Sequence, residues 1–151
     1  MPLATSHREA IISGCPLFMG LDARGAAAFA AVAVEVEFPA DRAIAREGEI
    51  GSGLFIIVDG HVRVVREGKV VTHMGPGEFF GELSVLDGAP RNASVWADVS
   101  TTCLAVATWD AERVMREEPG VALALLRVLA GRLREAVADH RYCPRPRTCV
   151  P

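Results

Sequence analysis

Short apolar stretches, separated by turns rich in glycine and proline, follow one another along this chain from Val32 to Ala107. The first of them alternates valine or phenylalanine with alanine or glutamate up to Phe38, which is typical of a half-buried strand. Further strands are predicted at residues 44–47, 54–58, 61–66, 70–74, 93–97 and 101–107. Short strands at such close and regular spacing indicate a β-sandwich or a jelly roll.

The turns between these strands predict how the chain reverses direction. Asp59-Gly60 is a strong hairpin signal, because both central positions tolerate a positive φ. The strand that returns from it, at residues 61–66, is expected to direct Val62 and Val64 inward. Glu67-Gly68 is predicted to turn the chain again, into the next strand.

Helical patterns flank the strands on both sides. Asp22 is positioned to cap a helix over residues 23–33, and Thr108 to cap one that runs to Arg116. Pro119 suits the first turn of a final helix. That last helix carries an apolar stripe made of Leu125, Leu126, Leu129, Leu133 and Val137. The predicted architecture is therefore mainly β: a double-stranded β-helix, or jelly roll, with an N-terminal helix and two C-terminal helices.

A chain of 151 residues, half of them hydrophobic, is expected to form one domain with its own core. Its most apolar early stretch, residues 26–34, is about half the length of a membrane-spanning helix. No secretory signal is recognisable. We therefore expect a soluble, cytoplasmic protein whose cysteines are reduced.

The cysteines and histidines predict neither a metal site nor a catalytic one. His140, Cys143 and Cys149 lie close in sequence, but their spacing matches no common zinc pattern and two prolines interrupt it. The histidines form no H-x-H pair, and no arrangement of serine, histidine and acid stands out. The sequence therefore favours a binding protein over an enzyme.

Residues 79–94 carry the chemistry that points to a ligand. Glu82 and Arg91 lie nine positions apart, separated by a helical turn that Gly81 opens and by an Asp87-Gly88 turn. A guanidinium presents a planar pair of donors to a phosphate, and a glycine lets backbone N–H groups close around the same anion. A carboxylate instead needs a hydroxyl donor, such as those of a ribose. A cyclic nucleotide carries both groups in compact form.

This segment resembles the phosphate-binding cassette of cyclic nucleotide-binding domains, in which phenylalanine-glycine-glutamate is followed, after a short gap, by proline-arginine and an alanine. Residues 16–21 are similar to the family's helical entry segment, and residues 46–49 and 54–64 to its paired barrel strands. The resemblance implies a cyclic nucleotide-binding domain over residues 12–140, followed by a flexible tail with proline and arginine over residues 141–151.

The resemblance also implies a role for each residue of the cassette. Arg91 would bind the cyclic phosphate, and Glu82 would accept a hydrogen bond from the ribose 2′-hydroxyl. An ion pair of Arg91 with Glu82 or Asp87, which would tie down the loop, is the structural alternative and is compatible with binding. Leu83, with Val62 and Val71, would form apolar walls. The expected ligand-binding residues are Gly81, Glu82, Leu83, Ser84, Arg91, Asn92 and Ala93.

The identity of the base is less constrained. The first expected ligand is cAMP and the alternative is cGMP, because Asn92 stands where family members usually carry alanine, serine or threonine. In related domains the final helix caps the base. Its register here places Glu135 to Val137 over the base, and both a contact from Arg134 or Glu135 and an apolar lid fit this pattern.

In such domains, ligand binding reorients the C-terminal helices, so the chain is expected to act as a regulatory sensor module. It resembles the sensor domains of catabolite-activator and Fnr-type regulators, without the helix-turn-helix domain, which speaks against DNA binding by this chain alone. The alternative is a structural or dimerisation module, because the spacing of Leu126, Leu129, Leu133 and Ala136 also resembles a short dimer seam. The intact cassette favours the sensor module. The sequence does not identify the downstream protein partner of such a sensor.

Overall fold

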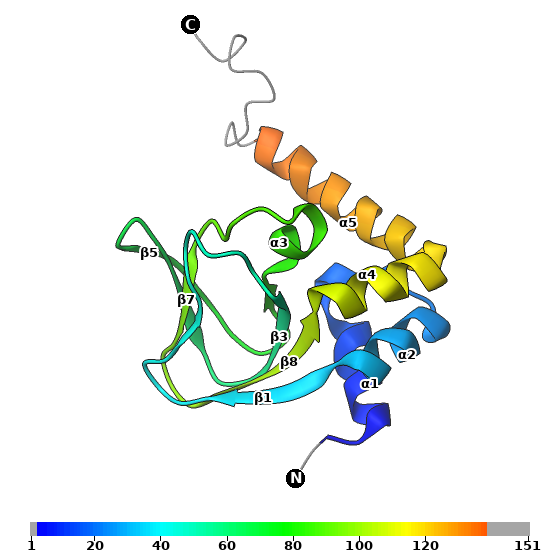
Figure 1. Ribbon diagram of the computed structural model, residues 1–151, viewed down its shortest axis with the longest axis horizontal. Helices are drawn as coiled ribbons and strands as arrows, with labels where there is room; N and C mark the ends of the chain where they lie inside the picture. Colours follow the sequence, from blue (N-terminus) through cyan, green and yellow to red (C-terminus); the bar gives the residue numbers. More distant parts are fainter. Residues whose placement is uncertain (1–2, 139–151) are drawn as a thin grey trace, which may run out of the picture.

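Two antiparallel four-stranded sheets form the body of the molecule in the computed structural model, which describes residues 3–138 (Figure 1). The first sheet has the strand order β1 (Val34–Phe38), β8 (Thr101–Ala107), β3 (Gly53–Asp59), β6 (Phe79–Phe80). The second has the order β2 (Ala43–Ala45), β7 (Ser94–Ala97), β4 (Val62–Arg66), β5 (Lys69–Met74). The predicted mainly-β jelly roll is confirmed.

The alternation of side chains along β3 builds two cores, one on each face of its sheet. Phe55 and Ile57 point into the roll, where they meet Val62, Val64 and other residues of the second sheet. Leu54 and Ile56 point the other way, into a second core that the helices complete. Val62 and Val64 are buried, as the sequence predicts.

The turn at Asp59-Gly60 does not form the predicted hairpin. β3 pairs with β8 and β6, whereas β4 pairs with β5 and β7, so this turn carries the chain from one sheet to the other. The local sequence specifies a tight turn but not the partner of each strand. The turn predicted at Glu67-Gly68 is present and joins β4 to β5 as a hairpin, with Arg66 opposite Lys69.

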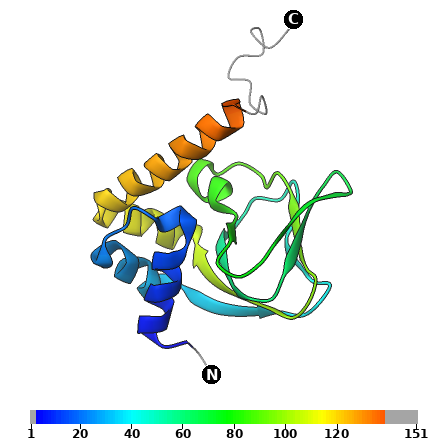
Figure 2. The same ribbon diagram turned by 180° about the vertical axis from the view of Figure 1, so that it is seen from behind.

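Helices cover the outer face of the β3–β8 sheet (Figures 1 and 2). They are α1 (Thr5–Gly14), the 3-10 turn η1 (Pro16–Phe18), α2 (Ala23–Val32), α4 (Thr108–Glu117) and α5 (Pro119–Ala138). Ile12, Phe18 and Phe29 are fully or almost fully buried between them and the sheet. α1 begins upstream of residue 12, where the domain was expected to begin.

The two predicted helix caps have different outcomes. The Asp22 carboxylate accepts a hydrogen bond from the Gly25 N–H at 2.8 Å, so it caps α2 as predicted. Thr108 is instead the first residue of α4, and Ala107 takes the cap position. The Thr108 N–H donates to the Ser52 carbonyl, because α4 continues directly from the paired end of β8.

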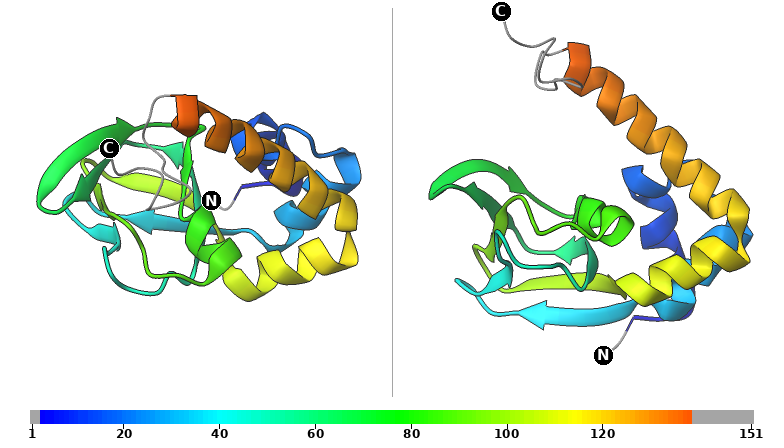
Figure 3. Two further views of the ribbon diagram at one scale, coloured as in Figure 1. Left: turned by 90° about the horizontal axis from the view of Figure 1, so that it is seen from above. Right: turned by 45° about the horizontal axis from the view of Figure 1, so that its top comes forward.

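The short helix α3 (Glu82–Asp87) follows β6 and lies beside β3 and α4. α5 passes α3, and its second half continues away from α1 and α2 (Figure 3). No helix among residues 3–138 combines the length and apolar character needed to cross a bilayer. The tail expected over residues 141–151, and the cluster of His140, Cys143 and Cys149, lie outside the described residues.

Candidate ligand-binding site

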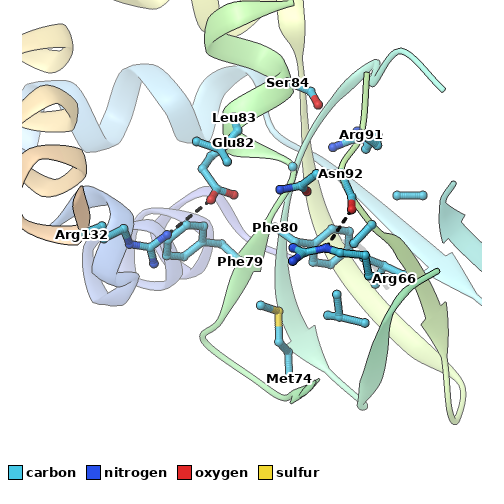
Figure 4. Close-up of a pocket in the computed structure, with 15 residues that line it drawn as sticks. Arg66, Met74, Phe79, Phe80, Glu82, Leu83, Ser84, Arg91, Asn92 and Arg132 are labelled. Atoms are coloured by element: carbon cyan, nitrogen blue, oxygen red, sulfur yellow. Dashed lines mark hydrogen bonds and ion pairs between the residues drawn. The ribbon is translucent and has the colours of Figure 1, made fainter. Parts of the chain in front are cut away.

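A cavity of about 190 Å³ opens between α3, the strands of the second sheet and α5. Figure 4 shows its lining, with Glu82 and Arg132 on one side and Arg66 and Asn92 on the other. The structure brings all seven residues expected from the sequence into this lining: Gly81, Glu82, Leu83, Ser84, Arg91, Asn92 and Ala93. Their roles in binding stay predictions.

Gly81 follows β6 and is the N-cap residue of α3, and only glycine fits there. Its φ is 90°, a left-handed conformation that other residues rarely adopt. A Cβ at this position would also meet the Arg91 guanidinium and lie 2.8 Å from the Gly53 carbonyl oxygen. This close approach brings the first turn of α3 directly against Arg91.

Glu82 is the first residue of α3, and its side chain is 14% exposed. Burial raises the pKa of its carboxyl, while its own backbone N–H and the guanidiniums of Arg132 and Arg91 act in the opposite direction. Its Oε1 lies 3.3 Å from Arg132 Nη1. This contact engages only one of the two carboxylate oxygens, so the group retains acceptor capacity toward the cavity.

Arg91 follows the α3 turn and is 8% exposed. Its Nη2 donates to the Gly53 carbonyl oxygen at 2.7 Å, whereas its buried Nη1 has no hydrogen-bond partner among the described residues. Burial lowers the pKa of this guanidinium, and the Glu82 carboxylate acts against that shift. The alternative ion pair of Arg91 with Glu82 or Asp87 does not occur within residues 3–138. Glu82 pairs with Arg132 instead, and the Asp87 carboxylate accepts a hydrogen bond from the Ala89 N–H.

The apolar wall of the cavity differs from the one expected. Neither predicted valine lines it: Val62 is fully buried, and Val71 is exposed on β5. Val71 lies at a shift in register, between the pairs Val64–Thr72 and Val65–Val70, so the alternation along β5 does not place it inward. Val64 and Met74 line the cavity in their place, together with Leu83.

Two arginines of the lining were not expected from the sequence. Arg132, on α5, pairs with Glu82, and its guanidinium carbon lies 4.2 Å from the centre of the Phe79 ring. Arg66, at the end of β4, donates from Nε to the Asn92 carbonyl oxygen at 3.1 Å. Arg132 lines the cavity, and neither Arg134 nor Glu135 does. No local motif marks these positions, because each contact joins residues far apart in sequence.

This arrangement suits a small ligand that carries both an anion and hydroxyl groups. Arg91 is a buried cation with an unmatched donor, which an anion would satisfy. Glu82, across the cavity, is a buried acceptor. Among the described residues no group of three or more potential metal ligands comes together.

Comparison with known proteins finds relatives of this chain in sequence and in fold. A family model described as the cyclic nucleotide-binding domain matches residues 35–118. A CRP-like cAMP-activated global transcriptional regulator of Mycobacterium tuberculosis is 33% identical over 136 residues, covering 83% of this chain and 58% of that protein. The cyclic AMP receptor protein of Thermus thermophilus is 35% identical over 130 residues, covering 83% of this chain and 60% of that protein.

Among solved structures, the N-terminal domain of a transcriptional regulator from Streptomyces coelicolor A3(2) is similar in fold. Its TM-score is 0.75 at 31% sequence identity, over 89% of this chain and 96% of that one. The chain thus spans about three fifths of the length of the two curated relatives, and nearly all of this solved domain.

Proposed function

Because the chain belongs to the cyclic nucleotide-binding domain family, we propose that it binds a cyclic nucleotide, cAMP first, and acts as a regulatory sensor module. The phosphate binds Arg91, and the ribose 2′-hydroxyl donates to Glu82. The names of the relatives from M. tuberculosis and T. thermophilus, which both refer to cAMP, support this choice of ligand.

The observation that carries the proposal is a buried guanidinium and a largely buried carboxylate on two walls of one cavity. Arg91 and Glu82 both line it, yet they do not pair with each other. A buried charge without a full set of partners is costly, so each group gains when a ligand supplies the missing donor or acceptor. A cyclic nucleotide supplies a phosphate for one and a hydroxyl for the other.

Transmission of the signal is proposed to run through α5. The contact between Arg132 and Glu82 joins this helix to the ribose-binding carboxylate. A ligand that engages Glu82 therefore changes the partner of a side chain on α5. It shifts the arrangement of the helices only as far as it binds one arrangement more tightly than the other.

The test is calorimetric titration of the purified chain with cAMP and then with cGMP, with Arg91→Ala alongside. Loss of a charge-assisted contact of roughly 1.5–3 kcal/mol weakens binding by about ten- to a hundredfold. Arg116→Ala is the matched control, since it removes an exposed guanidinium of α4 that does not line the cavity. We expect it to bind like the wild type.

Two results would count against this assignment. If the wild-type chain gave neither heat nor a thermal shift with either nucleotide, the proposed ligand would be wrong. If Arg91→Ala bound as tightly as the wild type but unfolded more easily, Arg91 would have a structural role only. The ratio of the cAMP and cGMP affinities settles the base preference in the same experiment.

A second function, dimerisation, is favoured by the surface of α5. Leu126 is 60% exposed and Leu133 is 47% exposed, so this part of the stripe does not cover the chain's own roll. Leu125, one position from Leu126, faces the core instead. We infer that the exposed leucines pack against a second copy of the chain, which is compatible with a sensor as well as with a purely structural module.

A further inference from the structure

The guanidinium of Arg91 does not face the cavity with all its donors. Nη2 is engaged by the Gly53 carbonyl oxygen at 2.7 Å, and Nη1 is buried without a partner among the described residues. Nη1 is therefore not accessible from the cavity and Nη2 is already engaged, so a phosphate gains both terminal nitrogens only after the side chain moves. The residue best suited to bind an anion is thus held in a position from which it does not offer both of them.

Gly51 makes this position available. A Cβ placed on Gly51 would lie 2.5 Å from Arg91 Cζ and 2.6 Å from both Nε and Nη2. Carbon and nitrogen atoms cannot approach so closely, so any side chain at residue 51 excludes the observed position of the guanidinium. The three atoms nearest to such a Cβ all belong to the Arg91 guanidinium group.

The other two glycines around Arg91, Gly53 and Gly81, are required for different reasons. A Cβ at Gly53 would collide with the Val106 carbonyl oxygen of the neighbouring strand, and Gly81 has a positive φ. Both positions therefore require glycine for the backbone itself. Gly51 has no φ in the left-handed region, so its backbone can accept alanine, and the conflict is with the Arg91 side chain.

We propose that Gly51 sets the ligand affinity of the site, because it gives Arg91 a resting position on the Gly53 carbonyl that the guanidinium must leave to bind phosphate. This inference rests on the proposed function of the cavity. The observed affinity is then the intrinsic affinity multiplied by the fraction of molecules in which the arginine has left that position. A side chain at residue 51 raises this fraction.

The decisive variant is Gly51→Ala, titrated with cAMP by calorimetry. If the resting position holds about nine tenths of the molecules, its exclusion tightens binding by about tenfold. A gain in affinity distinguishes the proposed role of Gly51 from a purely structural one. Replacement of a glycine that is needed only for structure lowers the affinity or leaves it unchanged. Circular dichroism and thermal unfolding establish that the variant is folded.

Two further variants isolate the cause. Gly14→Ala adds the same methyl group at the end of α1, where a Cβ meets nothing within 4 Å, and should leave the affinity unchanged. In the double variant Gly51→Ala with Arg91→Ala, the gain should disappear, because no guanidinium remains to be displaced. A gain that survived in the double variant would overturn the inference.

A structure of the wild-type chain with cAMP gives a test that does not depend on how Gly51→Ala folds. We expect Nη2 on the phosphate and no longer on the Gly53 carbonyl oxygen. Persistence of that bond with cAMP in the cavity, or an unchanged or weaker affinity of folded Gly51→Ala, would overturn the role of Gly51 and leave the proposed function standing. If neither the wild type nor Gly51→Ala bound cAMP or cGMP, the proposed function would fail and this inference with it.

Discussion

Glu82 is a largely buried carboxylate, and its burial has a cost to stability. Two guanidiniums lie near it, yet burial still raises the pKa of its carboxyl above the ordinary value of 4.5. A carboxyl with a higher pKa in the folded than in the unfolded chain binds protons more tightly when folded. Its contribution to the free energy of unfolding is therefore fully present below about pH 4.5 and is lost as the pH rises through the raised value.

The raised pKa of Glu82 predicts how Glu82→Gln behaves, because this variant keeps the shape of the side chain but cannot ionise. The free energy of unfolding of the variant should rise relative to the wild type as the pH increases through this window. Urea unfolding of both proteins at a series of pH values measures the difference. Glu112→Gln, an exposed site on α4, is the matched control. A difference for Glu82→Gln that did not change with pH would contradict the proposed effect of burial.

At the scale of elements, the second half of α5 is held to the rest of the molecule by few contacts. From Ala130 to Ala138 every residue is exposed except Ala136, which is half-buried. Arg132 alone of these residues lines the cavity, through its contacts with Glu82 and the Phe79 ring. This half of the helix is therefore expected to follow changes at Glu82.

Removing the contact should loosen the end of α5 without unfolding the domain. In Arg132→Ala, amide hydrogen exchange in the last two turns should accelerate by up to about fivefold, because a half-exposed ion pair contributes at most about 1 kcal/mol. Arg134→Ala removes a neighbouring exposed arginine outside the cavity and should leave exchange unchanged. Equal acceleration in both variants would mean that Arg132 has no special role in holding the helix.

At the scale of the whole molecule, the sequence predicted what depends on local pattern. Alternation located the strands, Asp22 located the start of α2, and the spacing of Glu82 and Arg91 located two walls of one cavity. It could not predict which strands pair across the turn at Asp59-Gly60. Hairpin turn chemistry describes only the few residues of the turn.

The features of the site that the sequence did not predict all depend on contacts between segments far apart in the chain. Arg132 meets Glu82 across 50 positions, and Arg91 meets Gly53 across 38. No periodicity spans such separations. Gly51 could not be identified from the sequence for the same reason. A glycine in a loop looks like an ordinary turn residue, and only the structure shows that the Arg91 side chain fills the space beside it.

The proposed dimer is also a property of the whole molecule, since it depends on which leucines the chain leaves uncovered. Leu123, Leu126, Leu133 and Val137 are each between 45% and 60% exposed. Steps of three, seven and four residues separate them, which places them along one side of a helix. Leu129 of the predicted seam is half-buried, so its replacement would also disturb packing within the chain.

The test therefore uses the double variant Leu126→Glu with Leu133→Glu, and light scattering coupled to size exclusion as the measurement. Burial of charge in the seam should convert a dimer into a monomer, because an unpaired buried carboxylate is strongly unfavourable. Val70→Glu changes an equally exposed valine on β5, outside α5, and should keep the dimer mass. If the double variant kept the mass of the wild type, the leucines of α5 would have no part in assembly. Transmission would then have to act within a single chain, through Arg132 and Glu82.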